Sequence, residues 1–258
     1  MANKRKRSKK QEAKASGEDL ALGARGGSKS DPEEGSAIVE WGKSIFFAGI
    51  LFLVFRSFLI QTFVITSGSM ENTLLVGDFL MVNRAAIGSR IPLTDIRIPG
   101  YSTVEQGDIL VFDPPHEENL KLVKRLIGMP GDVLEMRDKV LYRNGEAQDE
   151  PYVVRTDYGD QSDGSMLWQR EHLVGDMDPA EYRPTRDTWG PIRIPEGSYF
   201  MLGDNRDTSL DSRYWGLLDD WRLEGRAVVI YFSYNKGSFK PFPWIREVRP
   251  GRIGQLIR

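Results

Sequence analysis

The strongest constraint on the fold of this chain is a series of short β-rich runs between residues 79 and 232. Aliphatic and aromatic residues make up each run, and Gly, Pro, Asn and Asp residues mark the turns between them. No segment of this region keeps a sustained helical periodicity. The sequence therefore predicts a mainly β fold, an antiparallel sheet or barrel-like core, with Asn144 and Gly145 in a hairpin turn. The runs cover residues 79–82, 108–112, 122–123, 133–136, 140–142, 199–202 and 227–232.

The strand pattern is interrupted between about residues 146 and 195. Acidic residues, glycine, proline and isolated tryptophans replace it there, which is typical of a loop-rich segment. We therefore predict a β core made of residues 63–145 and 196–258, with residues 146–195 as an insertion subdomain. A chain of 258 residues with 40% hydrophobic residues is long and apolar enough to bury such a core.

Residues 1–36 have a different composition. Their basic cluster is followed by a run rich in Gly, Ser, Ala and Glu with almost no large apolar residue, and such a run cannot offset the entropy lost on ordering. We expect a disordered basic arm. A basic arm also fits nucleic acid, but the net charge of -2 and the pI near 5.9 give no overall field that attracts it, and the segment that follows favours a membrane. The basic cluster consists of Lys4, Arg5, Lys6, Arg7, Lys9 and Lys10.

Residues 37–62 are predicted to anchor the chain in a membrane. A helix needs ~20 residues to cross the hydrocarbon core of a bilayer, and residues 44–62 have about that length. Arg56 opposes this, but it lies near the end of the segment, where its side chain reaches the headgroups. A cleaved signal peptide and a buried core helix are the alternatives. The cations upstream predict a cytoplasmic N-terminus and place everything after Thr62 outside the cytoplasm.

The scarcity of certain residue types excludes several kinds of catalytic site. The chain has no cysteine, so thiolate nucleophiles, disulfides and zinc held by cysteine are excluded. It has two histidines, His116 and His172. His116 follows two prolines and His172 lies in a charged stretch without strand character, so neither context is typical of the rigid position a catalytic triad requires.

Ser67 and Ser69 are the candidate nucleophiles. They flank Gly68 directly after the apolar segment, and a Ser-Gly-Ser tripeptide alone is more typical of a linker. Ser69 and Met70, however, lead without a break into the β-rich run that begins at Phe79. Because a serine hydroxyl is a weak nucleophile until a neighbouring base removes its proton, the site needs a base elsewhere in the chain.

Lys124 is the candidate base. It lies among aliphatic residues in a predicted strand, followed by Arg125. Burial of Lys124 would lower its pKa toward neutrality, whereas a buried arginine keeps its charge. Because neighbouring residues of a strand point to opposite faces, one of the two cations must point inward. The alternative is an edge strand on which both are surface charges.

A third cluster of polar residues lies at 203–216, directly after the run at 199–202. Its density of Asp suggests a calcium loop, but Ser212 and Leu218 occupy the sixth and twelfth positions counted from Asp207, where such a loop needs Gly and Glu. The alternation of Asp and Arg instead predicts a network of ion pairs, with a solvated polar loop as the alternative. The hydroxyl of Ser209 is able to donate a hydrogen bond to a catalytic lysine or to accept one from it.

These segments, in this order, resemble the type I signal peptidases (leader peptidases) of bacteria. The resemblance rests on SGSM followed by TLLVGDFLMVNR, on GDILVF, on KRLIGMPGD and on GDNRDTSLDSRYWG. It implies that Ser69 is the acylated nucleophile and Lys124 the general base. It further implies that Ser67 donates to the oxyanion together with the backbone N–H of Ser69, and that Ser209 orients Lys124.

The resemblance also implies supporting residues. Asp204, Asp211 and Arg213 fall on positions that hold the active site through salt bridges, and Met70 flanks the nucleophile. One departure is Thr66, which stands where the family often has proline before the Ser-Gly-Ser turn.

The implied function is that of a membrane-bound serine endopeptidase that removes signal peptides from exported preproteins. It would cleave after small residues through an acyl-enzyme, without a metal or organic cofactor. Its partners would be the preproteins and the lipid bilayer, not nucleic acid; the sequence does not indicate an oligomeric state. The implied location is the inner (plasma) membrane, with a single span and a periplasmic or extracytoplasmic catalytic domain. The alternatives are a membrane-tethered β domain that only binds a partner, and another Ser/Lys peptidase that processes pilins or cleaves itself.

Overall fold

The computed structural model describes residues 33–258 apart from 59, 91–95, 118–119 and 158. The chain divides into two compact units, residues 1–46 and 47–258. Most of the predicted disordered arm lies outside the described residues, and its last residues, 33–36, begin the helix α1 (Glu33–Phe58).

The predicted apolar anchor falls on α1, whose 26 residues end at Phe58. Its side chains at Phe46, Phe47 and Leu53 are exposed. Within the ranges that the structure describes, no helix combines the length and the apolar character needed to cross a membrane. The helix is also shorter at its C-terminal end than predicted, because residues 60–62 belong to a strand, β1 (Ile60–Val64).

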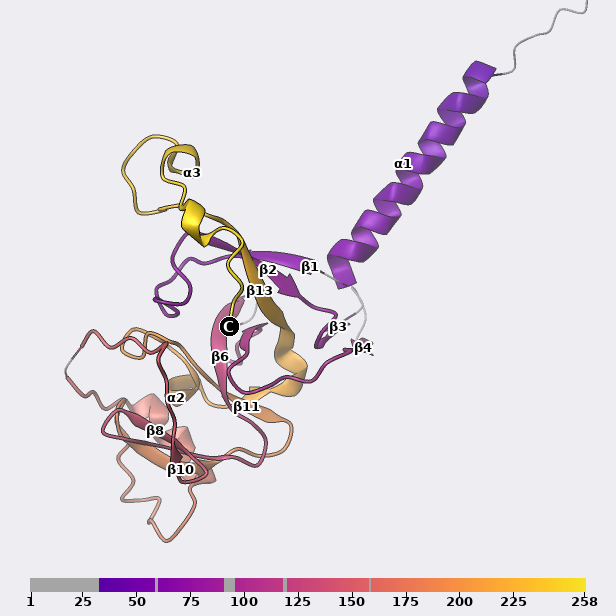
Figure 1. Ribbon diagram of the computed structural model, residues 1–258. Coiled ribbons are helices and arrows are strands. Elements are labelled where there is room, and N and C mark those ends of the chain that lie inside the picture. Colours follow the sequence, from indigo (N-terminus) through magenta and orange to yellow (C-terminus); the bar gives the residue numbers. More distant parts are fainter. Residues whose placement is uncertain (1–32, 59, 91–95, 118–119, 158) are drawn as a thin grey trace, which may run out of the picture. The chain divides into compact units, whose positions relative to one another are not determined.

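A seven-stranded antiparallel sheet forms the main body of the second unit, as the β-rich runs predicted (Figure 1). Its strand order is β1-β2-β13-β5-β6-β11-β12. The runs at 79–82, 108–112, 122–123, 199–202 and 227–232 all fall on its strands. Besides β1, these are β2 (Asp78–Asn83), β5 (Ile109–Phe112), β6 (Leu122–Gly128), β11 (Ser198–Leu202), β12 (Leu218–Asp219) and β13 (Leu223–Ser233).

A second sheet has four strands, in the order β10-β7-β8-β9. The predicted hairpin turn is confirmed, because Asn144 and Gly145 connect β8 to β9 with φ of 52° and 86°. A two-stranded sheet pairs β3 with β4. The strands are β3 (Gly88–Arg90), β4 (Arg97–Pro99), β7 (Val133–Arg137), β8 (Val140–Arg143), β9 (Glu146–Ala147) and β10 (Trp189–Arg193); the helices are α2 (Ser212–Trp215), α3 (Pro243–Arg246), η1 (Gly164–His172), η2 (Asp220–Arg222) and η3 (Pro250–Arg252).

The four-stranded sheet joins residues from both sides of the predicted boundary at 146. Strand β10 comes from the segment predicted as an insertion, and it pairs with β7 from the segment predicted as core, with Ile192 opposite Leu134. Because Gly190 and Pro191 are residues typical of turns, this strand was not recognised in the sequence. The pairing register shifts between Trp189 and Ile192, which accommodates the two residues within a strand.

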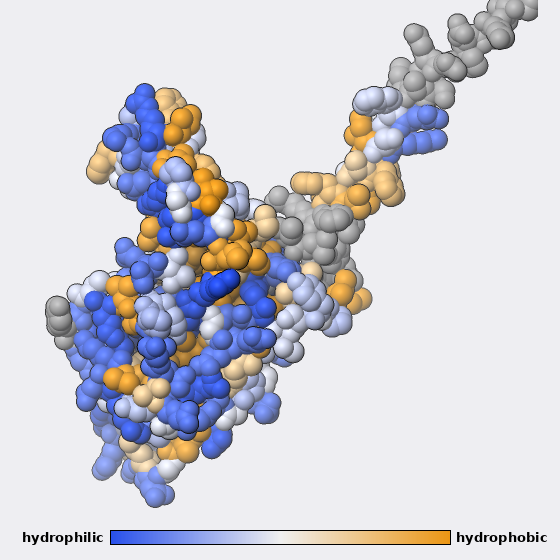
Figure 2. Space-filling model, viewed as in Figure 1, coloured by the Kyte–Doolittle hydropathy of each residue, from blue (hydrophilic) through white to orange (hydrophobic). Residues whose placement is uncertain are grey.

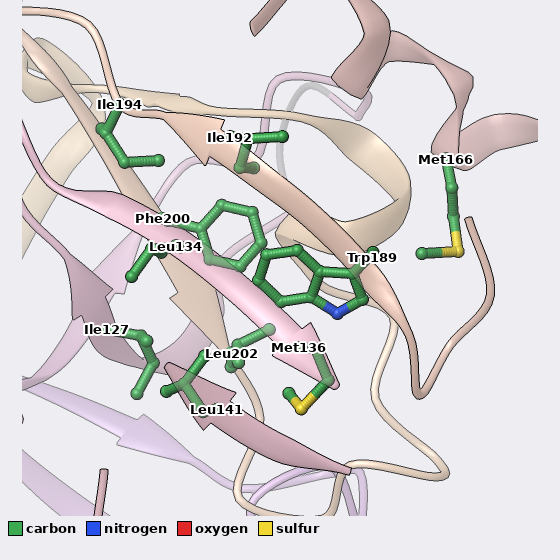
Figure 3. Packing of buried hydrophobic residues seen from close by; sticks show 10 residues of the cluster. All are labelled: Ile127, Leu134, Met136, Leu141, Met166, Trp189, Ile192, Ile194, Phe200 and Leu202. Atoms are coloured by element: carbon green, nitrogen blue, oxygen red, sulfur yellow. The ribbon is translucent and has the colours of Figure 1, made fainter. Parts of the chain in front are cut away.

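Strand β6 contributes to each of the buried hydrophobic clusters of the second unit. Ile127 packs with Trp189 and Phe200 between the four-stranded sheet and η1 (Figure 3), Leu126 packs in a second cluster, and Val123 lies against a third. Full burial of such a side chain contributes roughly 1.5–3 kcal/mol. Strand β6 is therefore held from several sides, and it carries Lys124.

Candidate active site

The Ser-Gly-Ser tripeptide lies in an ordered turn between β1 and β2. The N–H of Glu71 donates to the carbonyl of Gly68 at 3.0 Å, and the N–H of Leu74 donates to the carbonyl of Met70 at 2.7 Å. Ser69 is 8% exposed and Met70 is 1% exposed. The tripeptide is therefore part of the packed structure and not a linker.

Lys124 and Ser69 meet although 55 residues separate them. Lys124 Nζ lies 2.5 Å from Ser69 Oγ, and the lysine is 2% exposed. Strand β6 lies between β5 and β11, so the edge-strand alternative is wrong. The pKa of Lys124 is lowered from 10.5 to about 8, chiefly by burial; the charges of Asp211 and Asp204 raise it in part, and that of Arg213 lowers it. A substantial fraction of Lys124 is thus neutral near pH 8 and able to accept the Ser69 proton.

Two further serines lie close to this pair. Ser67 Oγ is 3.4 Å from Ser69 Oγ, and either hydroxyl is able to donate. Ser209 is 4% exposed, and its hydroxyl lies beside Asp211, whose pKa it helps to lower. A Cβ added at Gly203 would lie within 2.5 Å of both Ser209 Oγ and the Ser69 carbonyl oxygen. Only a glycine therefore fits between Ser209 and the backbone of the nucleophile.

The loop at 203–213 holds buried ion pairs, as its alternating Asp and Arg residues predicted. Asp211 accepts from Arg213 Nε and Nη2, both at 2.9 Å, and neither side chain is exposed. Burial alone would raise the pKa of Asp211, but Arg213 holds it below its usual value. Asp204 accepts from Arg125 Nε at 2.8 Å and Nη2 at 2.7 Å. The solvated-loop alternative is therefore wrong.

Several residues of the site were not predicted from the sequence. Arg125 was considered only as the neighbour of Lys124, yet it is the partner of Asp204, 79 residues away. Thr73 Oγ1 donates to Asp204 Oδ2 at 2.5 Å, and the N–H of Asn205 donates to the Ser69 carbonyl at 3.1 Å. The sequence did contain an indication of the role of Arg125. A buried carboxylate such as that of Asp204 needs a cation, and Arg125, on the face of the strand opposite to Lys124, is one.

The histidines lie against tryptophans. The ring centroid of His116 is 6.0 Å from that of Trp215, and the ring centroid of His172 is 5.6 Å from that of Trp168. In the part of the chain that the structure describes, neither contacts Ser69, and no cluster of His, Asp and Glu is arranged to hold a metal ion.

A cleft of about 280 Å³ opens onto the Ser69–Lys124 pair. One wall is formed by residues 64–70 and the other by residues 120–124. The first wall starts at Val64, the last residue of β1, and continues into the turn after it; the second consists of the residues that lead into β6 and the first residues of that strand. Strands β1 and β6 are not neighbours in the sheet. The sheet is therefore curled, so that its edge strand β1 returns toward β6. Residues Val64, Ile65, Thr66, Ser67, Ser69, Met70, Leu120, Lys121, Leu122, Val123 and Lys124 line the cleft.

The family described as signal peptidase, peptidase S26, matches residues 38–232. The chain belongs to this family. The match includes every residue of the site described above, and the resemblance seen in the sequence is confirmed. The chain is thus a serine endopeptidase, a hydrolase of the class that removes signal peptides.

Relatives in this family cover most of the chain. Signal peptidase I of Pseudomonas aeruginosa is 39% identical over 222 residues, which are 80% of this chain and 76% of that protein. Signal peptidase I of Bacillus licheniformis is 34% identical over 202 residues, 78% of this chain and 92% of that protein. A solved signal peptidase I from Enterococcus faecalis V583 is 33% identical, covers 48% of this chain and 97% of its own, and superposes with a TM-score of 0.34.

Proposed function

We propose that this chain removes signal peptides from exported preproteins through an acyl-enzyme, with Ser69 as nucleophile and Lys124 as general base. The observation that carries the proposal is the 2.5 Å between Ser69 Oγ and the Nζ of a lysine that is 2% exposed. Burial is the main cause that lowers the pKa of that lysine to about 8, so a fraction of it is neutral near neutral pH and able to act as a base.

The reaction follows from this geometry. Neutral Lys124 takes the Ser69 proton as Oγ attacks the scissile carbonyl carbon, and the carbonyl oxygen becomes an oxyanion. The N–H of Ser69 and the hydroxyl of Ser67 are the proposed donors to that oxyanion. Protonated Lys124 then gives its proton to the departing amine, and the C–N bond breaks. Lys124, neutral again, removes a proton from a water molecule as the water oxygen attacks the ester carbonyl carbon. It then returns that proton to Ser69 Oγ as the C–Oγ bond breaks, which restores the free hydroxyl and the neutral lysine.

The remaining residues that the family resemblance implies are proposed to support the dyad. Ser209, whose buried hydroxyl lies beside Asp211, orients Lys124. Asp204, Asp211 and Arg213 fix the loop beside it through the ion pairs described above. Met70 forms part of the cleft wall next to the nucleophile.

The cleft suits an extended peptide that ends in small side chains. Strand β1 is the edge of the large sheet, so its outer edge is open to a further strand within the described residues. A substrate added along it would place its side chains alternately toward and away from the cleft. Apolar residues such as Val64, Ile65 and Leu122 line the cleft, and its small volume favours residues of alanine size at the first and third positions before the scissile bond.

We further propose that the enzyme works at the plasma membrane, with a single span at α1, a cytoplasmic N-terminus and the site outside the cytoplasm. The exposed apolar residues of α1 support this, and so do those of the loop that carries α3. Figure 2 shows hydrophobic residues gathered on that loop, where Phe239, Phe242, Trp244 and Ile245 are exposed.

The membrane proposal is tested by extraction and protease protection. Expressed in a bacterial host, the chain should stay in the membrane pellet after alkaline carbonate treatment. The second unit should be digested in spheroplasts without lysis. Release by carbonate, or protection of the second unit until lysis, would contradict the topology while leaving the peptidase activity untouched.

The decisive experiment for the function is cleavage of a preprotein by the detergent-solubilised enzyme. We expect correct processing by the wild type and loss of at least roughly a thousandfold in Ser69→Ala and Lys124→Ala. The exposed residues Ser162 and Lys236 provide matched controls, and Ser162→Ala and Lys236→Ala should cleave normally. Full activity of either dyad variant would refute the mechanism. A folded wild type that cleaves no preprotein would instead favour a binding domain.

A further inference from the structure

Residues 150–154 form a short segment, here called the clamp segment, that lies against the 203–213 loop. It precedes η1 in the part of the chain predicted as an insertion. The N–H of Val154 donates to the Asp204 carbonyl at 2.9 Å, and the N–H of Arg206 donates to the Val154 carbonyl at 3.1 Å. The clamp segment thereby runs parallel to residues 204–206, with Val154 paired to Asn205.

Glu150 binds the buried Arg206. Its two carboxylate oxygens accept from Arg206 Nη1 at 2.9 Å and Nη2 at 2.5 Å. The Arg206 side chain is fully buried, and its Nε donates to the Gly203 carbonyl at 3.2 Å. A buried guanidinium without a carboxylate is strongly unfavourable, so Glu150 is what allows Arg206 to stay in place and hold Gly203.

Tyr152 joins this pair to the ion pair behind the catalytic lysine. The Arg125 guanidinium lies 3.8 Å from the centre of the Tyr152 ring, and the Tyr152 hydroxyl donates to Glu150 Oε1 at 3.0 Å. Burial raises the pKa of Tyr152, so the hydroxyl keeps its proton and remains a donor. Asn72 Nδ2 donates to the Tyr152 carbonyl at 3.3 Å, so the clamp segment also contacts the turn that carries the nucleophile.

The 203–206 turn transmits these contacts to the dyad. Gly203 lies against the Ser69 carbonyl and Ser209, so closely that a Cβ there would come within 2.5 Å of both. The N–H of Asn205 donates to the Ser69 carbonyl at 3.1 Å. A displacement of the turn would therefore move Ser69 relative to Lys124 and admit water between them.

We propose that Glu150 and Tyr152 are positioning residues of this peptidase. Together they press the 203–206 turn against the Ser69 carbonyl, which keeps Ser69 Oγ within hydrogen-bond distance of a dry Lys124. The proposal rests on the Ser69–Lys124 mechanism. It assigns a positioning role to the first part of the segment between β9 and η1.

The test compares kcat, KM and the pH dependence of kcat/KM in Glu150→Gln and Tyr152→Phe. Glu150→Gln keeps the shape of the side chain but removes its charge. We expect kcat to fall roughly tenfold to a hundredfold with little change in KM, because a small displacement of reacting groups has a large effect on rate. Water that enters beside Lys124 should solvate its charged form and raise its pKa, so the acidic limb of the profile should shift to higher pH. Tyr152→Phe keeps the ring over Arg125 and should give a smaller loss with the same shift.

Glu135 provides the matched control. It pairs with Arg137 on β7, away from the 203–213 loop, and Glu135→Gln should have wild-type kinetics. Glu150→Asp, which keeps the carboxylate, should recover part of the rate lost in Glu150→Gln. Folding of each variant is checked by circular dichroism.

The outcomes separate this proposal from the proposed function. If the wild type cleaves and Ser69→Ala does not, but Glu150→Gln and Tyr152→Phe keep the wild-type kcat and pH profile, the positioning role is refuted and the function stands. An activity loss in step with the unfolded fraction, with the acidic limb unmoved, would also refute it. If Ser69→Ala cleaves, the mechanism itself fails.

Discussion

Lys124 and Arg125 are consecutive residues of β6 that are both buried on opposite faces, and their electrostatic surroundings differ. Arg125 is bonded through two nitrogens to Asp204. Lys124 has no ion pair within the described residues, and its nearest polar partner is Ser69 Oγ at 2.5 Å. Arginine cannot lose its proton in a protein, whereas a desolvated lysine can. The strand therefore places a permanent cation and a potential base side by side, and only the base faces the cleft.

The first prediction concerns the pH dependence of cleavage. Because Lys124 must be neutral to accept the Ser69 proton, kcat/KM should rise with pH and level off above about 8, the pKa to which burial lowers this lysine. Below that value the rate should fall about tenfold per pH unit. The measurement is kcat/KM for a preprotein or peptide substrate at pH values from roughly 6 to 11. An acidic limb near 10.5, the ordinary lysine value, would contradict a desolvated base.

The second prediction concerns stability. The folded pKa of Lys124 lies below the unfolded value, so the folded state binds the proton less tightly, and the destabilisation is complete below about pH 8 and vanishes as the pH rises through 10.5. The shift corresponds to about 3 kcal/mol. Lys124→Met should therefore be more stable than the wild type at pH 7, and the gain should shrink toward pH 10.5. Urea unfolding at several pH values measures this, and a gain independent of pH would argue against it.

Much of the fold was predictable from the sequence because most strands are long enough to show their own pattern. The runs on β2, β5, β6, β7, β8, β11 and β13 were recognised in this way. Strand β1 was not, since Ile60–Val64 continues an apolar segment that reads as helix. Strands β9 and β12 have two residues each, too few for any periodicity.

The sequence indicated the central candidate residues of the site but not their geometry. Motif order indicated Ser69, Lys124 and Ser209, yet burial of Lys124 was left open by the sequence. The alternation of side chains along a strand requires only that one of Lys124 and Arg125 points inward. In the structure both are buried, because β6 lies between β5 and β11 and hydrophobic clusters surround it. Contacts across 79 residues, such as Arg125 to Asp204, depend on strand pairing that a local pattern does not encode.

The third prediction concerns Ser67. If its hydroxyl donates to the oxyanion, Ser67→Ala should lower kcat by about 10² to 10³ and leave KM nearly unchanged, because the bond forms mainly in the transition state. Ser67→Thr keeps a hydroxyl and should retain more activity. Steady-state kinetics at a pH above the acidic limb measure the effect, with the exposed Ser162→Ala as control. An increase in KM alone would assign Ser67 to substrate binding.

The fourth prediction concerns Asp211. Its charge raises the pKa of Lys124, so Asp211→Asn should lower that pKa further and move the acidic limb to lower pH. This is the direction opposite to that expected for Glu150→Gln. The variant also leaves Arg213 buried without its carboxylate, which should lower stability by about 3–5 kcal/mol. The control is Asp219→Asn, whose ion pair with Arg222 is more exposed. A limb that moves upward would mean that water entry outweighs the lost charge.

The last prediction concerns Gly203, where the nucleophile turn and the 203–213 loop touch. A methyl group there would lie within 2.5 Å of Ser209 Oγ and of the Ser69 carbonyl oxygen, closer than real Cβ contacts occur. Gly203→Ala should therefore displace Ser69, abolish measurable cleavage and destabilise the fold by roughly 1–3 kcal/mol. Gly164→Ala, with nothing within 4 Å of the added methyl, is the control and should be nearly neutral.

A double variant identifies which contact at Gly203 matters. Ser209→Gly removes the side chain on one side of the added methyl but leaves the Ser69 carbonyl on the other. We expect Gly203→Ala combined with Ser209→Gly to recover stability in part but not activity, for two reasons. The added methyl still meets the Ser69 carbonyl, which as backbone cannot move aside as a side chain can. The variant also lacks the Ser209 hydroxyl that is proposed to orient Lys124. Recovery of cleavage would locate the steric conflict at Ser209 alone, and would show that the 203–206 turn can shift without moving the nucleophile away from Lys124.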